Sequence, residues 1–314
     1  MIHYLQTRIL ALFVILLLMS MVVFSFIHLT PGDPVEAMLG TEVDRTTKDG
    51  LRHAMGLDRP LPAQYGVWMS RAVRGDLGAS VQTHQRVSSI LAEKLPITLE
   101  LTAAAAVVGL LIALPAGVLA AVRRNSAVDL GAMGIALAGV SIPSFWLGVM
   151  LILLFALHWR IFPSIGYVSF FRDPSEALRH LALPAVTLGL GLAGVLTRMV
   201  RSGVLEELGH EYVRTAKAKG LPFHAIINRH VLRNALLPTL TVLGVQVSVL
   251  LGGAVITEQI FAWPGVGQLA VSAIQSRDYP VLQGSILVVA VLATLVQLVV
   301  DLAYALMDPR IRFS

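Results

Sequence analysis

The sequence predicts an all-helical integral membrane protein, and three observations lead to that fold class. Of the 314 residues, 56% are hydrophobic and only 14% are charged, whereas about a quarter of residues are charged in ordinary soluble domains. The mean hydropathy is +0.75. Six apolar stretches reach or approach the roughly 20 residues that a helix needs to cross a bilayer. The predicted spans are Ile9 to Leu29, Ile97 to Val122, Leu130 to Leu157, Leu181 to Val200, Leu236 to Thr257 and Val281 to Leu306.

The first apolar stretch is predicted to be a retained span and not a secretory signal. Arg8 precedes it, as in a signal peptide, but the apolar run is too long. The sequence LTPGDP, from Leu29 to Pro34, follows where a cleavage site of small residues would be expected. We therefore expect residues 1–314 to form one transmembrane domain.

The long segment from Thr30 to Pro96 is expected to lie outside the cytoplasm, between the first two spans. It contains the amphipathic stretches VDRTTKDGLRHAMG and QYGVWMSRAVRG, which Gly and Pro residues interrupt. These stretches predict a small external cap of helices, with a tethered irregular loop as the alternative.

Lysine and arginine residues orient the spans. With the N-terminus inside, the 24 basic residues divide into 12 on each side. Eight of the outer ones lie in residues 30–96, and loops longer than about 60 residues cross the membrane largely regardless of charge. Without that loop, 12 basic residues lie inside and four outside, so both termini are predicted to be cytoplasmic.

The motifs for catalysis and cofactor binding are missing from the sequence. There is no cysteine, no Gly-x-x-x-x-Gly-Lys-Ser/Thr phosphate loop, no His-Glu-x-x-His pair and no Gly-x-Ser-x-Gly. His210, His224 and His230 share one loop but do not lie on one helix face. The basic residues are spread over separate loops, a pattern of membrane orientation more than of nucleic-acid binding. We therefore predict no catalytic, metal or cofactor site and no nucleic-acid partner.

Charged residues within the predicted spans are costly and are therefore candidates for a function. Asp301, Glu258 and Arg198 are the candidates for a pathway or gating role, and Glu100 also lies near a span end. All four are near the ends of their spans, whereas a proton-driven carrier is expected to hold acidic groups nearer the bilayer centre. For Asp301 a structural role at the helix end is the alternative.

One cytoplasmic stretch, EYVRTAKAKGLPFHAIINRHVLRNALLP, runs from Glu211 to Pro238. Gly220 predicts the end of a first short helix, and Pro222 predicts the first turn of a second one. In the second helix Phe223, Ile227 and Val231 recur every four residues and predict one apolar face. Arg229 and Arg233 are expected on the opposite side.

The first of these short helices has the features of a docking surface. Ala216 and Gly220 lie one turn apart and predict a patch of small residues that another protein can approach closely. Arg214, Lys217 and Lys219 surround the patch with positive charge. The alternative is a basic helix that lies on anionic lipid headgroups.

Here the sequence resembles a known family. RTAKAKG followed by ALLP resembles the cytoplasmic "EAA" loop of ATP-binding-cassette importer permeases, in the longer form of the peptide and nickel branch. Arg214 and Thr215 replace the first two residues of the general pattern, and Leu237-Pro238 comes five residues later than in it. Four further segments resemble the same branch, namely LTPGDP, IFAWPGVGQL at 260–269, RDYPVLQG at 277–284 and DPRIR at 308–312. The early Pro-Gly-Asp-Pro segment and the long first outer loop resemble the first of the two permeases in such systems.

The resemblance implies a type I importer fold in which residues 201–235 form a coupling loop. It implies that the loop contacts an ATPase subunit through Glu211, Arg214, Thr215, Ala216, Lys217, Gly220, Leu221 and Pro222. The implied partners are a second homologous permease, two ATPase subunits that bind ATP and Mg, and an extracytoplasmic solute-binding protein, in a bacterial cytoplasmic membrane. The expected cargo is a di- or oligopeptide, with a nickel chelate or glutathione as alternatives. An ion-coupled secondary transporter and an intramembrane enzyme are the rival classes.

Overall fold

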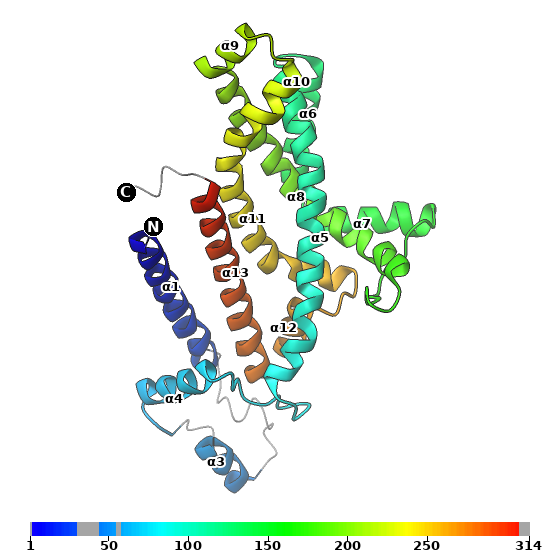
Figure 1. The fold of residues 1–314 in the computed structure, drawn as a ribbon. Coiled ribbons are helices and arrows are strands. Elements are labelled where there is room, and N and C mark those ends of the chain that lie inside the picture. Colours follow the sequence, from blue (N-terminus) through cyan, green and yellow to red (C-terminus); the bar gives the residue numbers. More distant parts are fainter. Residues whose placement is uncertain (1, 30–43, 55–57, 308–314) are drawn as a thin grey trace. The chain divides into compact units, whose positions relative to one another are not determined.

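A computed structural model describes residues 2–29, 44–54 and 58–307. Within these residues the regular structure is helical, apart from one isolated antiparallel bridge between Ala79 and Arg86. The α-helices are labelled in Figure 1, and two π-helical segments are named η1 and η2. In chain order the elements are α1 (Ile2–Leu29), α3 (Arg45–Ala54), α4 (Leu61–Val73), α5 (Val87–Val122), α6 (Ala127–Ser141), α7 (Ser144–Leu151), η1 (Ile152–His158), α8 (Pro174–Leu208), α9 (Glu211–Ala218), α10 (Phe223–Ile226), η2 (Ile227–Val231), α11 (Leu232–Ile260), α12 (Val266–Gln275) and α13 (Tyr279–Met307).

The predicted spans correspond to long apolar helices, with one exception in shape. Four helices of the described residues are long and apolar enough to cross a membrane, at Val87–Val122, Pro174–Leu208, Phe223–Ile260 and Tyr279–Ala303. A bent helix pair adds a fifth. Within α1, which has 28 residues, the described stretch Leu10–Ser25 is apolar. The total of six spans therefore stays a prediction.

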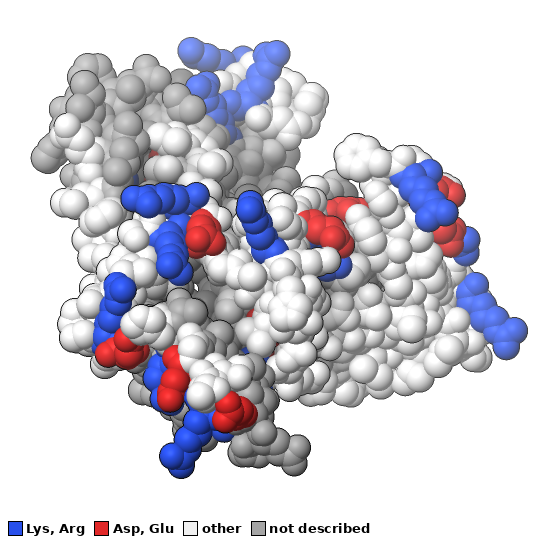
Figure 2. Space-filling view, turned by 90° about the horizontal axis from the view of Figure 1, so that it is seen from below, with Lys and Arg blue, Asp and Glu red and all other residues white. Residues whose placement is uncertain are grey.

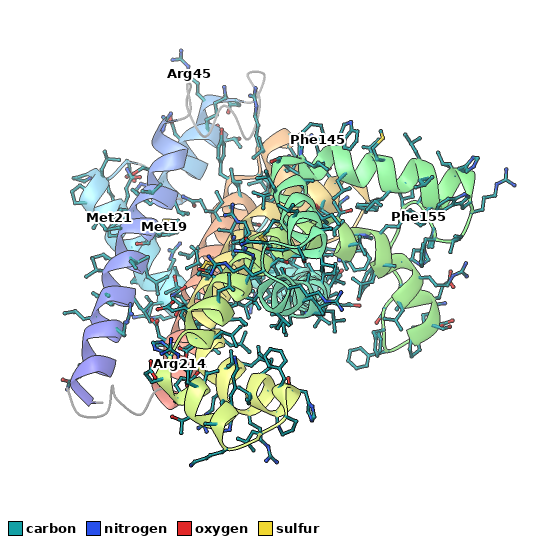
Figure 3. The ribbon with its side chains drawn as sticks, turned by 90° about the horizontal axis from the view of Figure 1, so that it is seen from above. Met19, Met21, Arg45, Phe145, Phe155 and Arg214 are labelled. Carbon is teal, nitrogen blue, oxygen red and sulfur yellow. The ribbon has the colours of Figure 1, made fainter. Side chains whose placement is uncertain are left out.

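The third predicted span, Leu130 to Leu157, is not one straight helix. Its two parts, Ala127–Ser141 and Ser144–His158, meet at an angle of 103°. Pro143 caps the start of α7, and the residue before a proline is pushed away from helical geometry, so α6 ends at Ser141. The arm formed by α7 and η1 turns away from α6 (Figure 1), and Figure 3 labels Phe145 and Phe155 on it.

The described chain divides into two compact units. The first unit contains Leu99–Trp263 and the chain from Leu295 onward. Its core is α8, because 67% of the apolar window of that helix is buried, against 17 to 33% for the other three long helices. Two glycines of α8 let neighbouring backbones approach. A methyl group at Gly194 would lie 2.4 Å from the Ala136 carbonyl oxygen of α6, and one at Gly203 would lie 2.7 Å from the Ala235 carbonyl oxygen of α11.

The second unit contains Ile2–Thr98 and Pro264–Thr294. The segment predicted to form an external cap contains the helices α3 and α4, and its side of the membrane stays a prediction. Buried Asp278 accepts a hydrogen bond of 2.5 Å from the Ser80 hydroxyl, and the Gln283 amide donates to the Val23 carbonyl oxygen at 3.2 Å. Two residues of the RDYPVLQG motif therefore connect segments of this unit that are far apart in the sequence.

The surface seen from below shows mixed charge. In Figure 2 lysine and arginine side chains alternate with aspartate and glutamate, and large areas carry neither. An ion pair of this kind joins Arg52 to Asp49 in α3 at 3.1 Å. This pattern does not form a single basic patch. The LTPGDP and DPRIR segments lie largely outside the described residues.

Candidate functional site

The cytoplasmic loop of the prediction is a compact pair of short helices with an apolar inner face. Val213 and Ala216 of α9 pack in one cluster with Ile226, Ile227 and Val231 of α10 and η2. The cluster also holds buried residues of α5, α8 and α11, namely Ala121, Val200, Val204 and Ala235. Because these contacts are buried, the helix pair is fixed to the ends of the long helices and is not a free connector (Figure 1).

The break between the two short helices follows the predicted chemistry. Gly220 has φ +77°, a left-handed conformation that glycine adopts without penalty. The Leu221 N–H donates to the Ala216 carbonyl oxygen at 3.3 Å and the Gly220 N–H to that of Lys217 at 2.9 Å, which is the Schellman pattern. Pro222 then caps α10. The predicted stop and restart are confirmed, and the second helix runs on through η2 into α11.

The outer face of α9 is polar and exposed. Arg214 donates to the Glu211 carboxylate at 2.7 Å, and the two side chains are 73% and 79% exposed. Thr215, Lys217 and Lys219 are also exposed. Figure 3 labels Arg214 on this helix. The face of α9 that lies away from the apolar cluster therefore carries an Arg–Glu ion pair, a threonine and a lysine, and Lys219 follows at the helix end.

Two details of the predicted surface are wrong. Ala216 is only 7% exposed and belongs to the apolar cluster, so Ala216 and Gly220 do not form a small-residue patch on the surface. Phe223 is 44% exposed and does not share the buried face of Ile227 and Val231. Burial follows from the tertiary packing around α9, and the wider turn of η2 alters the register that a regular four-residue spacing assumes.

Tyr212 anchors the start of α9 to the end of α8. Its hydroxyl donates to the Glu207 carboxylate at 2.5 Å and lies 3.5 Å from the His230 carbonyl oxygen. Burial of the phenol, together with the neighbouring Glu207 carboxylate, raises the pKa of Tyr212 to about 12. His210 stacks on the same ring at 6.0 Å. These contacts hold α9 in a defined orientation.

An ion pair that the sequence reasoning missed joins the start of α6 to α8. Arg201 donates twice to Asp129, at 2.5 Å from Nε and 2.7 Å from Nη2. Asp129 is 3% exposed and also accepts from the Asn125 backbone N–H at 2.9 Å. The Ser-x-x-Asp pattern from Ser126 is a helix-start signal that could have drawn attention to Asp129, but its partner lies 72 residues away.

The three predicted pathway residues lie on three different helices. Glu258 of α11 is fully buried, Asp301 of α13 is 6% exposed, and Arg198 of α8 is exposed. None of them lines the cavity described next. Their pathway or gating role stays a prediction.

A cavity of about 260 Å³ lies in the first unit, at the bend between α6 and α7. Residues of α6, α7, α8 and α11 line it, and no charged side chain is among them. Within the described part of the chain, no group of three or more histidine, aspartate or glutamate residues is arranged to hold a metal ion.

These features define a class of protein. Several helices are long and apolar enough to span a membrane, and the short α9–α10 pair packs on α5, α8 and α11, which indicates a membrane protein with a rigid surface outside its spans. Residues 113–313 match the model of the family described as binding-protein-dependent transport system inner membrane component, and residues 1–102 match the N-terminal model of the same system. The chain belongs to this family of ATP-binding-cassette importer permeases and is a multi-pass inner-membrane transport subunit.

Similar proteins agree with this assignment. The dipeptide transport system permease protein DppB of Escherichia coli K12 is 42% identical over 317 residues, which cover 93% of this chain and 94% of the relative. A protein of Brucella suis biovar 1 is 40% identical over 319 residues, with complete coverage of both chains.

The fold also matches solved structures. A chain from an inward-facing structure of the MetNI methionine ABC transporter matches with a TM-score of 0.59 at 22% identity. The match covers 70% of this chain and 96% of that one. At this identity it shows the fold, and the predicted type I importer architecture is thereby confirmed.

Proposed function

We propose that this chain is a permease subunit that moves di- or oligopeptides inward across the bacterial cytoplasmic membrane, driven by ATP hydrolysis in separate ATPase subunits. The peptide cargo is supported by the 42% identity to a dipeptide permease. The chain itself carries no phosphate-binding loop, so ATP and Mg are assigned to the partner subunits.

The α9–α10 pair is the observation that carries the coupling proposal. Its inner face is buried against α5, α8 and α11, whereas its outer face exposes Arg214, Thr215 and Lys217. A force applied to the outer face is transmitted to the long helices, because the packed cluster deforms little. We assign the contact with an ATPase subunit to the exposed residues of the predicted set, Glu211, Arg214, Thr215, Lys217, Gly220, Leu221 and Pro222. Ala216 acts from beneath by fixing α9 to the cluster.

The remaining partners follow from the family. A binding-protein-dependent system includes an extracytoplasmic solute-binding protein, and we assign to this chain a second homologous permease and two ATPase subunits. The distribution of basic residues supports cytoplasmic termini, with 12 inside and four outside once the long outer segment is omitted. In this orientation α9 and α10 face the cytoplasm, where ATPase subunits are accessible.

Nickel chelates and glutathione are the alternative cargoes, because relatives of the peptide and nickel branch share the coupling-loop motif. An uptake assay with all three solutes separates these alternatives. An ion-coupled transporter would take up its cargo without ATPase subunits, so the same assay performed without them tests that class.

Reconstituted vesicles test the proposal directly. The complete complex with its binding protein is expected to import alanyl-phenylalanine only when ATP is inside. Reversal of charge at Arg214, Lys217 and Lys219 to glutamate is expected to lower both uptake and stimulated ATP hydrolysis at least 10-fold. Arg71→Glu, on exposed α4, serves as the matched control. Unchanged ATP-coupled uptake by the triple variant would overturn the proposed coupling role.

A further inference from the structure

The cavity in the first unit lies where a span is interrupted. Pro143 lies between α6 and α7, which meet at an angle of 103°, and residues of α8 and α11 form the other walls. A straight helix would fill this space with its own side chains. The volume of about 260 Å³ is close to the lower end of the roughly 300–1,000 Å³ of small-molecule sites.

Two polar side chains line the cavity without a hydrogen-bond partner among the described residues. They are the Ser144 hydroxyl, at the first position of α7, and the Gln246 amide, in the middle of α11. A third polar residue, Thr187, donates its hydroxyl to the Leu183 carbonyl oxygen of its own helix. Both side chains are partly exposed, so a ligand in the cavity can reach their hydrogen-bonding groups.

The chemistry of the lining selects one kind of ligand. A primary amide carries both a donor and an acceptor, and so does a peptide bond, so the two can pair in both directions. Apolar residues such as Leu192, Val249 and Leu250 surround this group. A free ammonium or carboxylate would find no opposite charge here, and desolvation without a partner is unfavourable.

We propose that this cavity is a cargo subsite that holds an uncharged, amide-containing part of a peptide, with Gln246 paired to a peptide bond and the apolar wall against a side chain. The proposal rests on the proposed importer function and specifies the cargo chemistry within the membrane. The subsite recognises the peptide backbone, so it fits cargo of varied sequence.

Two adjacent glycines of α11 provide a matched test. Gly253 lines the cavity, Gly252 does not, and an added side-chain atom at either position meets nothing within 4 Å. Leucine therefore gains the same helix propensity at both positions but fills the cavity only at 253. Likewise Gln246→Leu removes the amide, and Gln259→Leu makes the same change on an exposed position of the same helix.

Uptake of alanyl-phenylalanine and ATP hydrolysis are measured in vesicles that contain the complete complex. Gly253→Leu is expected to lower uptake at least 10-fold while ATP hydrolysis persists, and Gly252→Leu to transport like the parent. Gln246→Leu is expected to raise the KM for uptake roughly 2- to 10-fold, as the loss of one or two neutral hydrogen bonds predicts. Gln259→Leu keeps the parental KM.

A photoreactive dipeptide that contains p-benzoyl-phenylalanine reads occupancy directly. It is expected to label the cavity-lining parts of α6, α7, α8 or α11 in the parent and not in Gly253→Leu. Parental uptake and KM in both Gly253→Leu and Gln246→Leu, or photolabelling that Gly253→Leu does not change, would overturn the subsite. Failure of the proposed function looks different, because then the unmodified complex itself shows no ATP-dependent uptake.

Discussion

Two helices of the first unit, α7 and α10, begin after a proline with nearly the same backbone geometry, but the two helix starts have different surroundings. Pro143 has φ −60° and ψ 131°, and Pro222 has φ −67° and ψ 144°. Before Pro222, Gly220 closes α9 with two backbone hydrogen bonds, and an apolar cluster lies beneath. Before Pro143 there is no such glycine, and an uncharged cavity lies at the break.

The difference shows what a helix break can do in two solvents. In water Gly220 and Leu221 are exposed while their N–H groups are hydrogen-bonded within the chain, so the break can present a rigid surface to another protein. Within an apolar span the same interruption opens space that the protein lines with a few uncommitted polar groups, Ser144 and Gln246. One break is therefore assigned to the ATPase partner and the other to the cargo.

The largest expected effect comes from a charge placed under the α9 surface. Val213 is fully buried in the apolar cluster, so Val213→Asp is expected to destabilise the fold by about 3 kcal/mol or more. Arg214→Asp places the same residue one position further, where the side chain is 73% exposed, and is expected to change stability by less than about 0.5 kcal/mol. Thermal unfolding in detergent compares the two, and equal midpoints would contradict the packed inner face.

The next effect tests Gly220, the residue that is present at the α9–α10 break and has no counterpart at the α6–α7 break. Gly220 has φ +77° with open space around it, so the cost of a side chain is conformational and not steric. Gly220→Val is expected to cost about 1–2 kcal/mol and to reduce ATP-coupled uptake. Asparagine tolerates this conformation, so Gly220→Asn is expected to retain most of the activity. Equal losses in both variants would mean that the conformation of this residue is not what matters.

A smaller effect tests the anchor of α9. Tyr212→Phe removes the hydrogen bond to Glu207 and is expected to cost about 1 kcal/mol in unfolding free energy. Since the pKa of Tyr212 rises from 10.0 to about 12 on folding, its contribution is complete below pH 10 and is lost as the pH rises through 12. The ionisation signal near 295 nm that disappears in Tyr212→Phe should titrate near pH 12. A midpoint near 10 would contradict the buried hydrogen bond.

The smallest stability effect is expected at the other break. Pro143→Ala removes the restriction that the proline places on the backbone of Ile142, so the angle between α6 and α7 can decrease. The expected change in the free energy of unfolding is about 1 kcal/mol or less. The chain has no cysteine, so Ile135→Cys and Leu153→Cys, both at exposed positions, carry spin labels without background. The label distance is expected to lengthen in Pro143→Ala. Pro115→Ala, within continuous α5, is the control, and equal distances in all three proteins would contradict a proline-set bend.

Local signals explain what the sequence predicted well. The stop at Gly220 and the restart at Pro222 depend on residues next to one another, and both are present in the structure. The burial of Ala216 was not predicted because it depends on α5, α8 and α11.

The same limit applies to the membrane-embedded features. Proline is frequent in membrane spans, so its presence at 143 did not distinguish a sharp break from the continuous helices around Pro115 and Pro184. The Asp129–Arg201 ion pair joins residues that are far apart in the sequence. The cavity likewise brings Gln246 next to residues of α6, α7 and α8. Such pairings emerge only once the helices are packed.

The most direct measurement of the central claim is a cross-link from α9. In the cysteine-free chain, Lys217→Cys provides a single reactive site on the exposed face, and Ser276→Cys provides one at the exposed end of α12. With a maleimide–diazirine reagent, which reacts with the thiol and on illumination with any nearby side chain, the Lys217→Cys variant is expected to join to an ATPase subunit in the assembled complex, with a yield that changes when ATP is added. The Ser276→Cys variant is not. Cross-linking of Ser276→Cys alone to an ATPase, or no ATPase adduct in Lys217→Cys, would contradict the account.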